Sequence, residues 1–136
     1  IGTLKMYQLV KWGVFLVVVP EFLIKRIYKK GSLKGLENGA SFALKNVLGP
    51  GFISGVNSVT INDTVYESKD IKLVMTDKEI LAQDITEANP VAFRLGQEGT
   101  LVMSGKASVI NGNNKIVIEV LNPEAGKVQV KVEDIV

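Results

Sequence analysis

The chemistry open to this chain is limited first by two residue types that it lacks. It has no His and no Cys. Their absence removes the commonest general base near neutral pH, the thiolate nucleophile and the usual ligands of zinc, copper and non-haem iron. Ser-His-Asp and Cys-His arrangements are impossible. Carboxylate, Lys, Tyr and Ser/Lys chemistry remains, so the acidic side chains are the first candidates for a site.

Acidic residues are concentrated in one part of the sequence, at Asp63, Glu67, Asp70, Asp77 and Glu79. A calcium loop places several oxygen ligands at fixed spacing within one short loop, and that spacing is absent. A carboxylate pair for glycoside hydrolysis is defined by distance in space, and nothing in the spacing favours one. We interpret these residues as solvated strand ends and turns. We predict no catalytic residue, no metal site and no cofactor.

Two further sequence patterns have some features of ligand-binding sites. The glycine-rich segment Gly49–Gly55 differs in spacing from the dinucleotide fingerprint and lacks the Lys-Ser/Thr ending of a phosphate loop, so it is interpreted as a turn. The basic segment 25–34 can attract nucleic acid by charge. Its neighbours are aliphatic, however, and the remainder of the chain is net acidic. We therefore predict no nucleic-acid partner.

Charge divides the chain into two parts. Residues 1–36 carry seven basic side chains and one acidic side chain, whereas residues 37–136 carry nine basic and 13 acidic ones. This distribution indicates a basic arm joined to an ordinary, mildly acidic domain. The composition, with 46% hydrophobic and 22% charged residues, is that of a folded globular protein.

The basic arm, residues 1–30, is predicted to be an amphipathic helix running from Leu4 to Lys30, with a kink at Pro20. The apolar run between Lys11 and Lys25 is short for a membrane span, which favours a helix lying in the membrane interface. Contacts with membrane or with a second copy are predicted for Met6, Leu9, Val10, Trp12, Phe15, Leu16, Val17, Phe22, Ile24, Ile27 and Tyr28. Contacts with anionic lipid are predicted for Lys25, Arg26, Lys29, Lys30 and Lys34.

The alternative for this apolar face is a role in protein packing alone, against the rest of the chain or a neighbouring chain. Residues 31–39, with Gly31 and Gly35, are predicted to be a helix stop and a linker. The first residue is Ile rather than Met, for which we expect either a removed leader or numbering inside a longer chain.

Residues 40–136 are predicted to form an antiparallel β-sandwich of immunoglobulin-like or Greek-key type. The apolar period changes from 3.6 to 2 near Ala40, and turn residues recur every 8–12 positions. The clearest strands are Lys115–Leu121 and Lys127–Glu133, and a shorter strand is predicted at residues 107–110. Asn62-Asp63-Thr64 is predicted to close a hairpin.

The stretch from Val59 to Met75, followed by Gly105 to Val120 and a closing valine strand, resembles the small β subunit of C-glycoside deglycosidases. Such subunits are β-sandwiches that assist a metal-dependent catalytic subunit, so the resemblance implies a sandwich fold and a larger protein partner. It matches no catalytic motif. The whole chain also resembles small archaeal membrane-associated proteins of unknown role, which implies no mechanism.

These observations predict a non-enzymatic, membrane-anchored structural or interaction protein that forms homo-oligomers, with its β domain on the cytoplasmic side. Two alternatives remain open. One is an extracellular, pilin-like filament subunit with a helical core and an outer β-sandwich. The other is an accessory β subunit of a carbohydrate-active enzyme.

Overall fold

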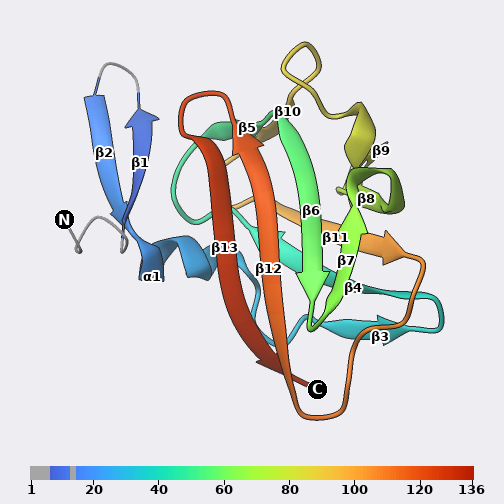
Figure 1. Ribbon diagram of the computed structural model, residues 1–136. Helices are drawn as coiled ribbons and strands as arrows, with labels where there is room; N and C mark the ends of the chain where they lie inside the picture. The colour runs from blue at the N-terminus through green and yellow to red at the C-terminus, as the bar shows by residue number, and fades with distance from the viewer. Residues whose placement is uncertain (1–6, 13–14) are drawn as a thin grey trace.

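The computed structural model describes residues 7–12 and 15–136 and shows a mainly β protein (Figure 1). Its strands are β1 Tyr7–Trp12, β2 Phe15–Pro20, β3 Lys34–Leu36, β4 Gly39–Lys45, β5 Gly51–Ile53, β6 Gly55–Ile61, β7 Thr64–Glu67, β8 Ile71–Val74, β9 Glu79–Leu81, β10 Val91–Phe93, β11 Glu98–Ser104, β12 Asn113–Asn122 and β13 Gly126–Ile135. The helical elements are α1 Glu21–Ile24 and the 3-10 turns η2 Lys25–Ile27, η3 Ser68–Asp70 and η4 Ala82–Asp84.

Two antiparallel sheets form the body of the protein. One has the strand order β3-β4-β11-β8-β9 and the other the order β13-β12-β6-β7, while β5 and β10 form a small separate pair. The neighbours β4 and β11, and likewise β6 and β12, are far apart in the sequence, so pairings between distant segments hold each sheet together. The predicted fold class, a mainly β protein in which an N-terminal helix precedes antiparallel sheets, is confirmed, although the helix is short.

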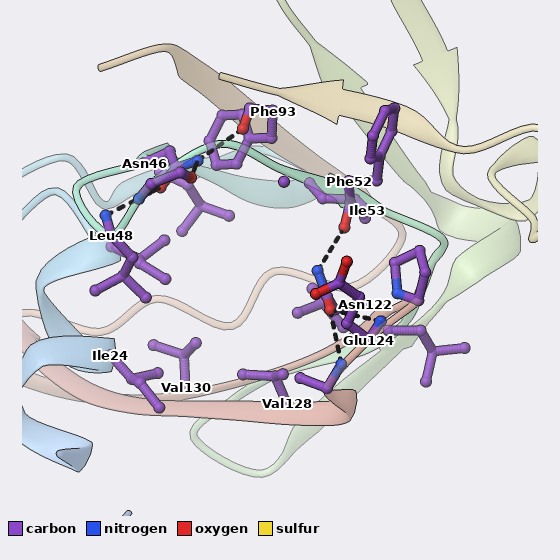
Figure 2. Close-up of a pocket in the computed structure, with 18 of the residues that line it drawn as sticks. Ile24, Asn46, Leu48, Phe52, Ile53, Phe93, Asn122, Glu124, Val128 and Val130 are labelled. Carbon is purple, nitrogen blue, oxygen red and sulfur yellow. Dashed lines mark hydrogen bonds between the residues drawn. The ribbon is translucent and has the colours of Figure 1, made fainter. Parts of the chain in front are cut away.

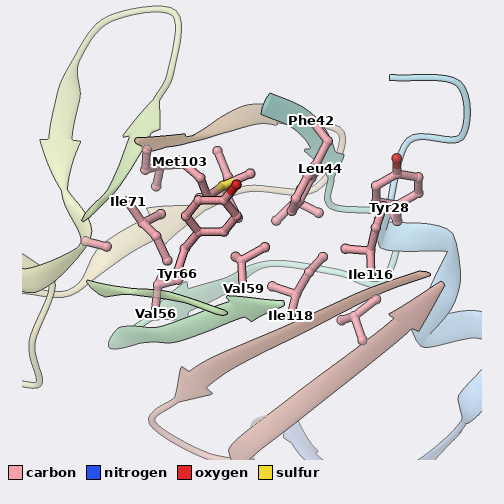
Figure 3. Packing of buried hydrophobic residues seen from close by; sticks show 14 of the residues in the cluster. Tyr28, Phe42, Leu44, Val56, Val59, Tyr66, Ile71, Met103, Ile116 and Ile118 are labelled. Carbon is pink, nitrogen blue, oxygen red and sulfur yellow. The ribbon is translucent and has the colours of Figure 1, made fainter. Parts of the chain in front are cut away.

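The hydrophobic core lies between these sheets (Figure 3). Phe42 and Met103 from the five-stranded sheet meet Val59 and Ile118 from the four-stranded sheet, and all four are almost completely buried. The period-2 pattern explains this arrangement, because alternate residues of each strand point into the core and the others point to solvent. Each large aliphatic or aromatic side chain buried in this way stabilises the fold by about 1.5–3 kcal/mol.

The loops show one correct and one wrong prediction. Asn62, at a φ of 55°, and Asp63 close the β6–β7 hairpin as predicted. Residues 107–110, predicted to be a strand, are irregular. Side-chain hydrogen bonds hold this segment in place of the backbone hydrogen bonds that a strand would form. The Tyr66 hydroxyl donates to Ser108 Oγ at 2.7 Å, and Asn62 Nδ2 donates to the Ser108 carbonyl at 2.8 Å.

The N-terminal helix is much shorter than predicted, because β1 and β2 form an antiparallel hairpin in which Leu9 pairs with Val18 and Trp12 with Phe15. Val17–Val19 is a β-branched run that suits a strand better than a helix. Pro20 ends the second strand, and the helical region is confined to α1 and η2. Among residues 7–12 and 15–136, no helix has the length and apolar character needed to cross a membrane.

The predicted boundaries also change. Residues 31–39 are not a linker, because β3 pairs with β4 and joins the five-stranded sheet, and Leu33 is buried in the core. The β domain therefore begins within α1, where Ile24 is 2% exposed. The turn that connects the hairpin to the sheets is thus part of the domain.

Candidate functional site

A buried hydrogen-bond cluster fixes the turn η2 to the last strand of the protein. The Tyr28 hydroxyl donates to Asp134 Oδ2 at 2.6 Å, and the backbone amide of Gly31 donates to the same oxygen at 2.9 Å. The amide of Leu33 lies 3.5 Å from that oxygen, and the amide of Ile135 donates to Oδ1 at 2.9 Å. Asp134 is 3% exposed. We call Tyr28, Asp134 and the amides of Gly31 and Leu33 the Asp134 clasp.

The electrostatics of the clasp favour a charged carboxylate and a neutral phenol. Burial alone would raise the pKa of Asp134. The hydrogen bonds from Tyr28 and from the Gly31, Leu33 and Ile135 amides outweigh burial and hold the pKa below its ordinary value. Burial, together with the neighbouring carboxylate, raises the pKa of Tyr28. This arrangement stabilises structure and leaves neither group poised to exchange protons near neutral pH.

The structure separates the residues predicted to contact membrane or a second copy into three groups. Met6 lies outside the described residues. Leu9, Val10, Trp12, Phe15, Leu16 and Val17 lie in β1 and β2, for which the backbone is described. Phe22 is 66% exposed, whereas Ile24 and Tyr28 are buried in the core and Ile27 packs against it.

For Ile24 and Tyr28 the prediction is therefore wrong, because their apolar surface is already covered by the protein's own β domain. Ile27 is half-buried and has little surface left for an outside contact. The apolar stripe divides at α1, so the part C-terminal to Phe22 belongs to the core. Among the predicted contact residues whose side chains are described, Phe22 stays exposed and available for an outside contact.

The predicted lipid-binding cations are all exposed: Lys25, Arg26, Lys29, Lys30 and Lys34. Lys29 forms an ion pair with Glu98, at 2.8 Å between Nζ and Oε1, which lowers the pKa of Glu98. The others lie on η2 and the segments that follow it. The structure places Lys34 in β3, on the five-stranded sheet.

Two cations that the sequence did not single out lie beside this cluster. A groove of about 520 Å³ is lined by Lys25 and Lys30 together with Lys115 of β12 and Lys131 of β13. Among the described residues of the lining, Glu133 is the acidic side chain. Strand alternation predicts that Lys115 and Lys131 face solvent, but only the fold brings their strands next to η2. We call this feature the cationic groove.

On the other side of η2 lies an apolar cavity of about 280 Å³ at one end of the sandwich (Figure 2). It is lined by side chains from both sheets, the β5–β10 pair and the helical region, among them Ile24, Leu44, Phe93, Val120, Val128 and Val130. Its polar lining side chains are Asn46, Asn122 and Glu124. We call it the apolar cavity.

Two asparagines hold the loops that border the apolar cavity. Asn46 Nδ2 donates to the carbonyls of Gly49 and Phe93, at 2.5 and 2.6 Å, and its Oδ1 accepts from the amides of Leu48 and Gly49. Asn122 bridges to the Phe52 carbonyl at 3.0 Å and also accepts from the two amides that follow Pro123. Since these amide groups are engaged with the backbone, they serve to shape the cavity.

The acidic residues weighed as a chemical site are not brought together into one. Asp63, Glu67, Asp70, Asp77 and Glu79 are all exposed. Glu79 lies 3.7 Å from Lys72 and Glu67 lies 4.0 Å from Lys69, in weak surface pairs. Within the part of the chain that the structure describes, no three acidic side chains gather closely enough to hold a metal ion.

A comparison with protein families identifies the family to which the chain belongs. Residues 23–136 match the family described as hydroxymethylglutaryl-CoA reductase, N-terminal domain. The match begins within α1 and runs through β13, so it covers both sheets, the Asp134 clasp and both sides of η2. No curated protein matches the chain significantly. The chain belongs to the hydroxymethylglutaryl-CoA reductase N-terminal domain family.

Proposed function

We propose that this chain is a non-enzymatic interaction domain that binds anionic membrane surfaces through the β1–β2 hairpin, Phe22 and the cations around η2, and that self-associates there. The observation that carries the proposal is the hairpin itself. It is a separate two-stranded sheet whose main neighbour in the described chain is α1 (Figure 1). It is apolar at every position described except Gln8, Lys11 and Pro20.

A hairpin of this kind needs an outside partner. An isolated two-stranded sheet is marginally stable in water, and its apolar residues gain most by leaving water. Phe22, 66% exposed at the base of the hairpin, extends the apolar surface. Trp12 and Phe15 pair at the end of the hairpin distant from α1, and aromatic residues favour the membrane interface.

The cations support the choice of an anionic lipid surface as the partner. Lys25 and Arg26 directly follow the helix that carries Phe22, and the cationic groove continues the positive charge onto β12 and β13. A cation near an anionic leaflet contributes about 1 kcal/mol to binding. A basic cluster next to a membrane-embedded segment also favours the cytoplasmic side, where we propose the β domain lies.

Vesicle flotation tests the proposal on the full chain. We expect wild-type protein to float with vesicles of phosphatidylglycerol and phosphatidylcholine. The variant V17D/V19D, which puts charge into β2, should stay at the bottom of the gradient. The matched control V47D/V65D places the same charges at two exposed positions of the β domain, 44% and 61% exposed, and should float like wild type.

The electrostatic part of the proposal has its own variants. K25Q/R26Q should weaken partitioning onto anionic vesicles about thirtyfold, which corresponds to about 2 kcal/mol for two charges. K78Q/R94Q removes one Lys and one Arg from exposed positions elsewhere and should leave partitioning unchanged. Wild-type protein that fails to float, or a V17D/V19D variant that floats equally well, would overturn membrane binding.

Self-association is proposed through the same hairpin and through β13. This ten-residue strand is the edge of the four-stranded sheet, and an open edge offers backbone groups to a further strand. Sedimentation equilibrium should show a concentration-dependent oligomer for wild type that V17D/V19D shifts toward monomer. A strict monomer at all concentrations would count against this part.

A second candidate is an accessory domain of a larger enzyme. The family description names a terminal domain of an enzyme, and the resemblance to the β subunit of C-glycoside deglycosidases points in the same direction. In this case the hairpin would dock on a catalytic partner. Co-purification of a stoichiometric larger protein with the full chain, lost in V17D/V19D while vesicle binding is absent, would favour this candidate.

A further inference from the structure

We propose that the apolar cavity beside η2 binds the acyl chain of a single anionic amphiphile, such as a fatty carboxylate or a phospholipid. This inference is independent of membrane binding by the hairpin. It rests on the size and lining of the cavity and on the charge at one of its ends.

The size of the cavity indicates an occupant. Protein interiors pack as densely as organic crystals, and voids larger than a water molecule are few. An apolar cavity of roughly 150 Å³ stays dry and accepts benzene, and this one measures about 280 Å³. Its walls are side chains of both sheets: Leu44 of β4 on one side, and Val120 and Val128, which pair across β12 and β13, on the other.

The lining specifies the chemical class of the occupant. Asn46 and Asn122 use their amide groups to bond the surrounding loops, and Glu124 is exposed at the cavity's edge. A sugar or nucleotide placed in the cavity would lose its hydrogen bonds to water with few replacements, which is costly. A flexible hydrocarbon chain has no such requirement, and its burial is favourable.

The charge around the cavity favours an anionic head group at one end. Figure 2 shows Ile24 and Glu124 at opposite ends of the cavity. At the Ile24 end, Lys25 and Arg26 follow directly on η2, and Lys25 also lines the cationic groove on the other side of this turn. An acyl chain bound with its anionic head at this end would therefore place the head near these cations and far from the Glu124 carboxylate.

Calorimetric titration of the full chain with dodecanoate, below its micelle concentration and without vesicles, tests the proposal. We expect one molecule to bind per chain. V120F fills the cavity and should weaken binding at least tenfold, whereas V65F, the same change at a position 61% exposed on β7, should leave it unchanged. If circular dichroism shows that V120F is unfolded, V128F takes its place.

The head group is tested by comparing ligands. K25Q/R26Q should weaken binding of dodecanoate about tenfold and leave binding of dodecanol unchanged, while K78Q/R94Q should alter neither. Vesicles containing a fluorescent phospholipid that can transfer to the protein distinguish a phospholipid source from a free fatty acid. Absence of dodecanoate binding to wild type, or equal binding by the cavity-filling variant, would overturn the proposal. Vesicle flotation by the hairpin is measured separately and can succeed or fail on its own.

Discussion

Replacing Asp134 with Ala tests whether η2, and with it the base of the hairpin, is held to the β domain by the Asp134 clasp. The substitution leaves the Tyr28 hydroxyl and the Gly31 amide without their acceptor, and these groups now lie 2.6 and 2.9 Å from the carboxylate. A buried polar group left without a partner costs about 1–3 kcal/mol. Two such groups, with the weaker contact to Leu33, predict a loss of about 3–5 kcal/mol in the free energy of unfolding.

The neighbouring variant Glu133→Ala is the matched control, because Glu133 is exposed and surface substitutions usually change stability by less than about 0.5 kcal/mol. Tyr28→Phe removes one donor to a charged acceptor and should cost about 1.5–3 kcal/mol. Urea unfolding followed by circular dichroism at pH 7 measures all three. The reasoning is refuted if Asp134→Ala unfolds within about 1 kcal/mol of Glu133→Ala.

The dependence of stability on pH gives the clasp a second signature. Because the folded-state pKa of Asp134 is below its ordinary value, its contribution is complete above about pH 4 and is lost as the pH falls through the folded-state pKa. Asp134→Ala should therefore flatten the acid limb of the stability curve. The pKa of Tyr28 is raised, so its contribution is complete below about pH 10 and is lost as the pH rises further. Tyr28→Phe should remove that alkaline loss.

Three further predictions follow from particular contacts. Asn46→Ala should lower the free energy of unfolding by about 2–4 kcal/mol in urea unfolding, because it removes four loop hydrogen bonds, three of them buried. Asn57→Ala, at an exposed position, should lower it by less than about 1 kcal/mol. Gly39→Ala should yield no soluble folded protein on expression, because the new Cβ would lie 1.9 Å from the Met103 carbonyl oxygen. Gly112→Ala meets open space and should fold with a loss of about 1–3 kcal/mol from its positive φ. Raising NaCl to about 1 M should release the protein from vesicles in proportion to the cations involved, as measured by flotation.

The β domain was largely predictable because its strands alternate cleanly. β12 and β13 extend the predicted segments 115–121 and 127–133 by one or two residues at each end. The alternation of apolar and polar residues in β12 predicts that Ile116 and Ile118 are buried, as they are. A shift of one residue in the strand register would turn all of its apolar side chains to solvent. Strand order was not predictable, since the neighbours of β11 and β12 are set by packing between segments far apart in the sequence.

The sequence of the N-terminal arm does not distinguish a helix from a hairpin, because an apolar run of this length fits a helix or a strand equally well. The predicted amphipathic helix groups Ile24 and Tyr28 with Leu9 and Val17 on one apolar face. The structure separates them at Pro20, with the hairpin before it and core residues after it. Asp134 gave no signal in the sequence, where it appears as one more acidic residue near the end of a strand. Its role depends on a partner 106 residues away.

The candidate site could be predicted only in part from the sequence, because it too is formed by residues that are far apart in the chain. The cations near η2 were evident as a cluster, whereas Lys115 and Lys131 join them only when β12 and β13 pack beside that turn. The apolar cavity exists because the side chains at the ends of the two sheets and of α1 do not fill the space between them. Periodicity records which residues face inward, but it does not record how well they pack.

The central claim, that the hairpin enters the membrane interface, is tested most directly by the fluorescence of Trp12. This residue is the single Trp of the chain and lies in β1, so its emission reports the hairpin alone. We expect a blue shift on adding anionic vesicles and quenching by bromine atoms placed high on the lipid acyl chains. Emission that stays unchanged with every vesicle composition, from protein that is folded by circular dichroism, would contradict the account.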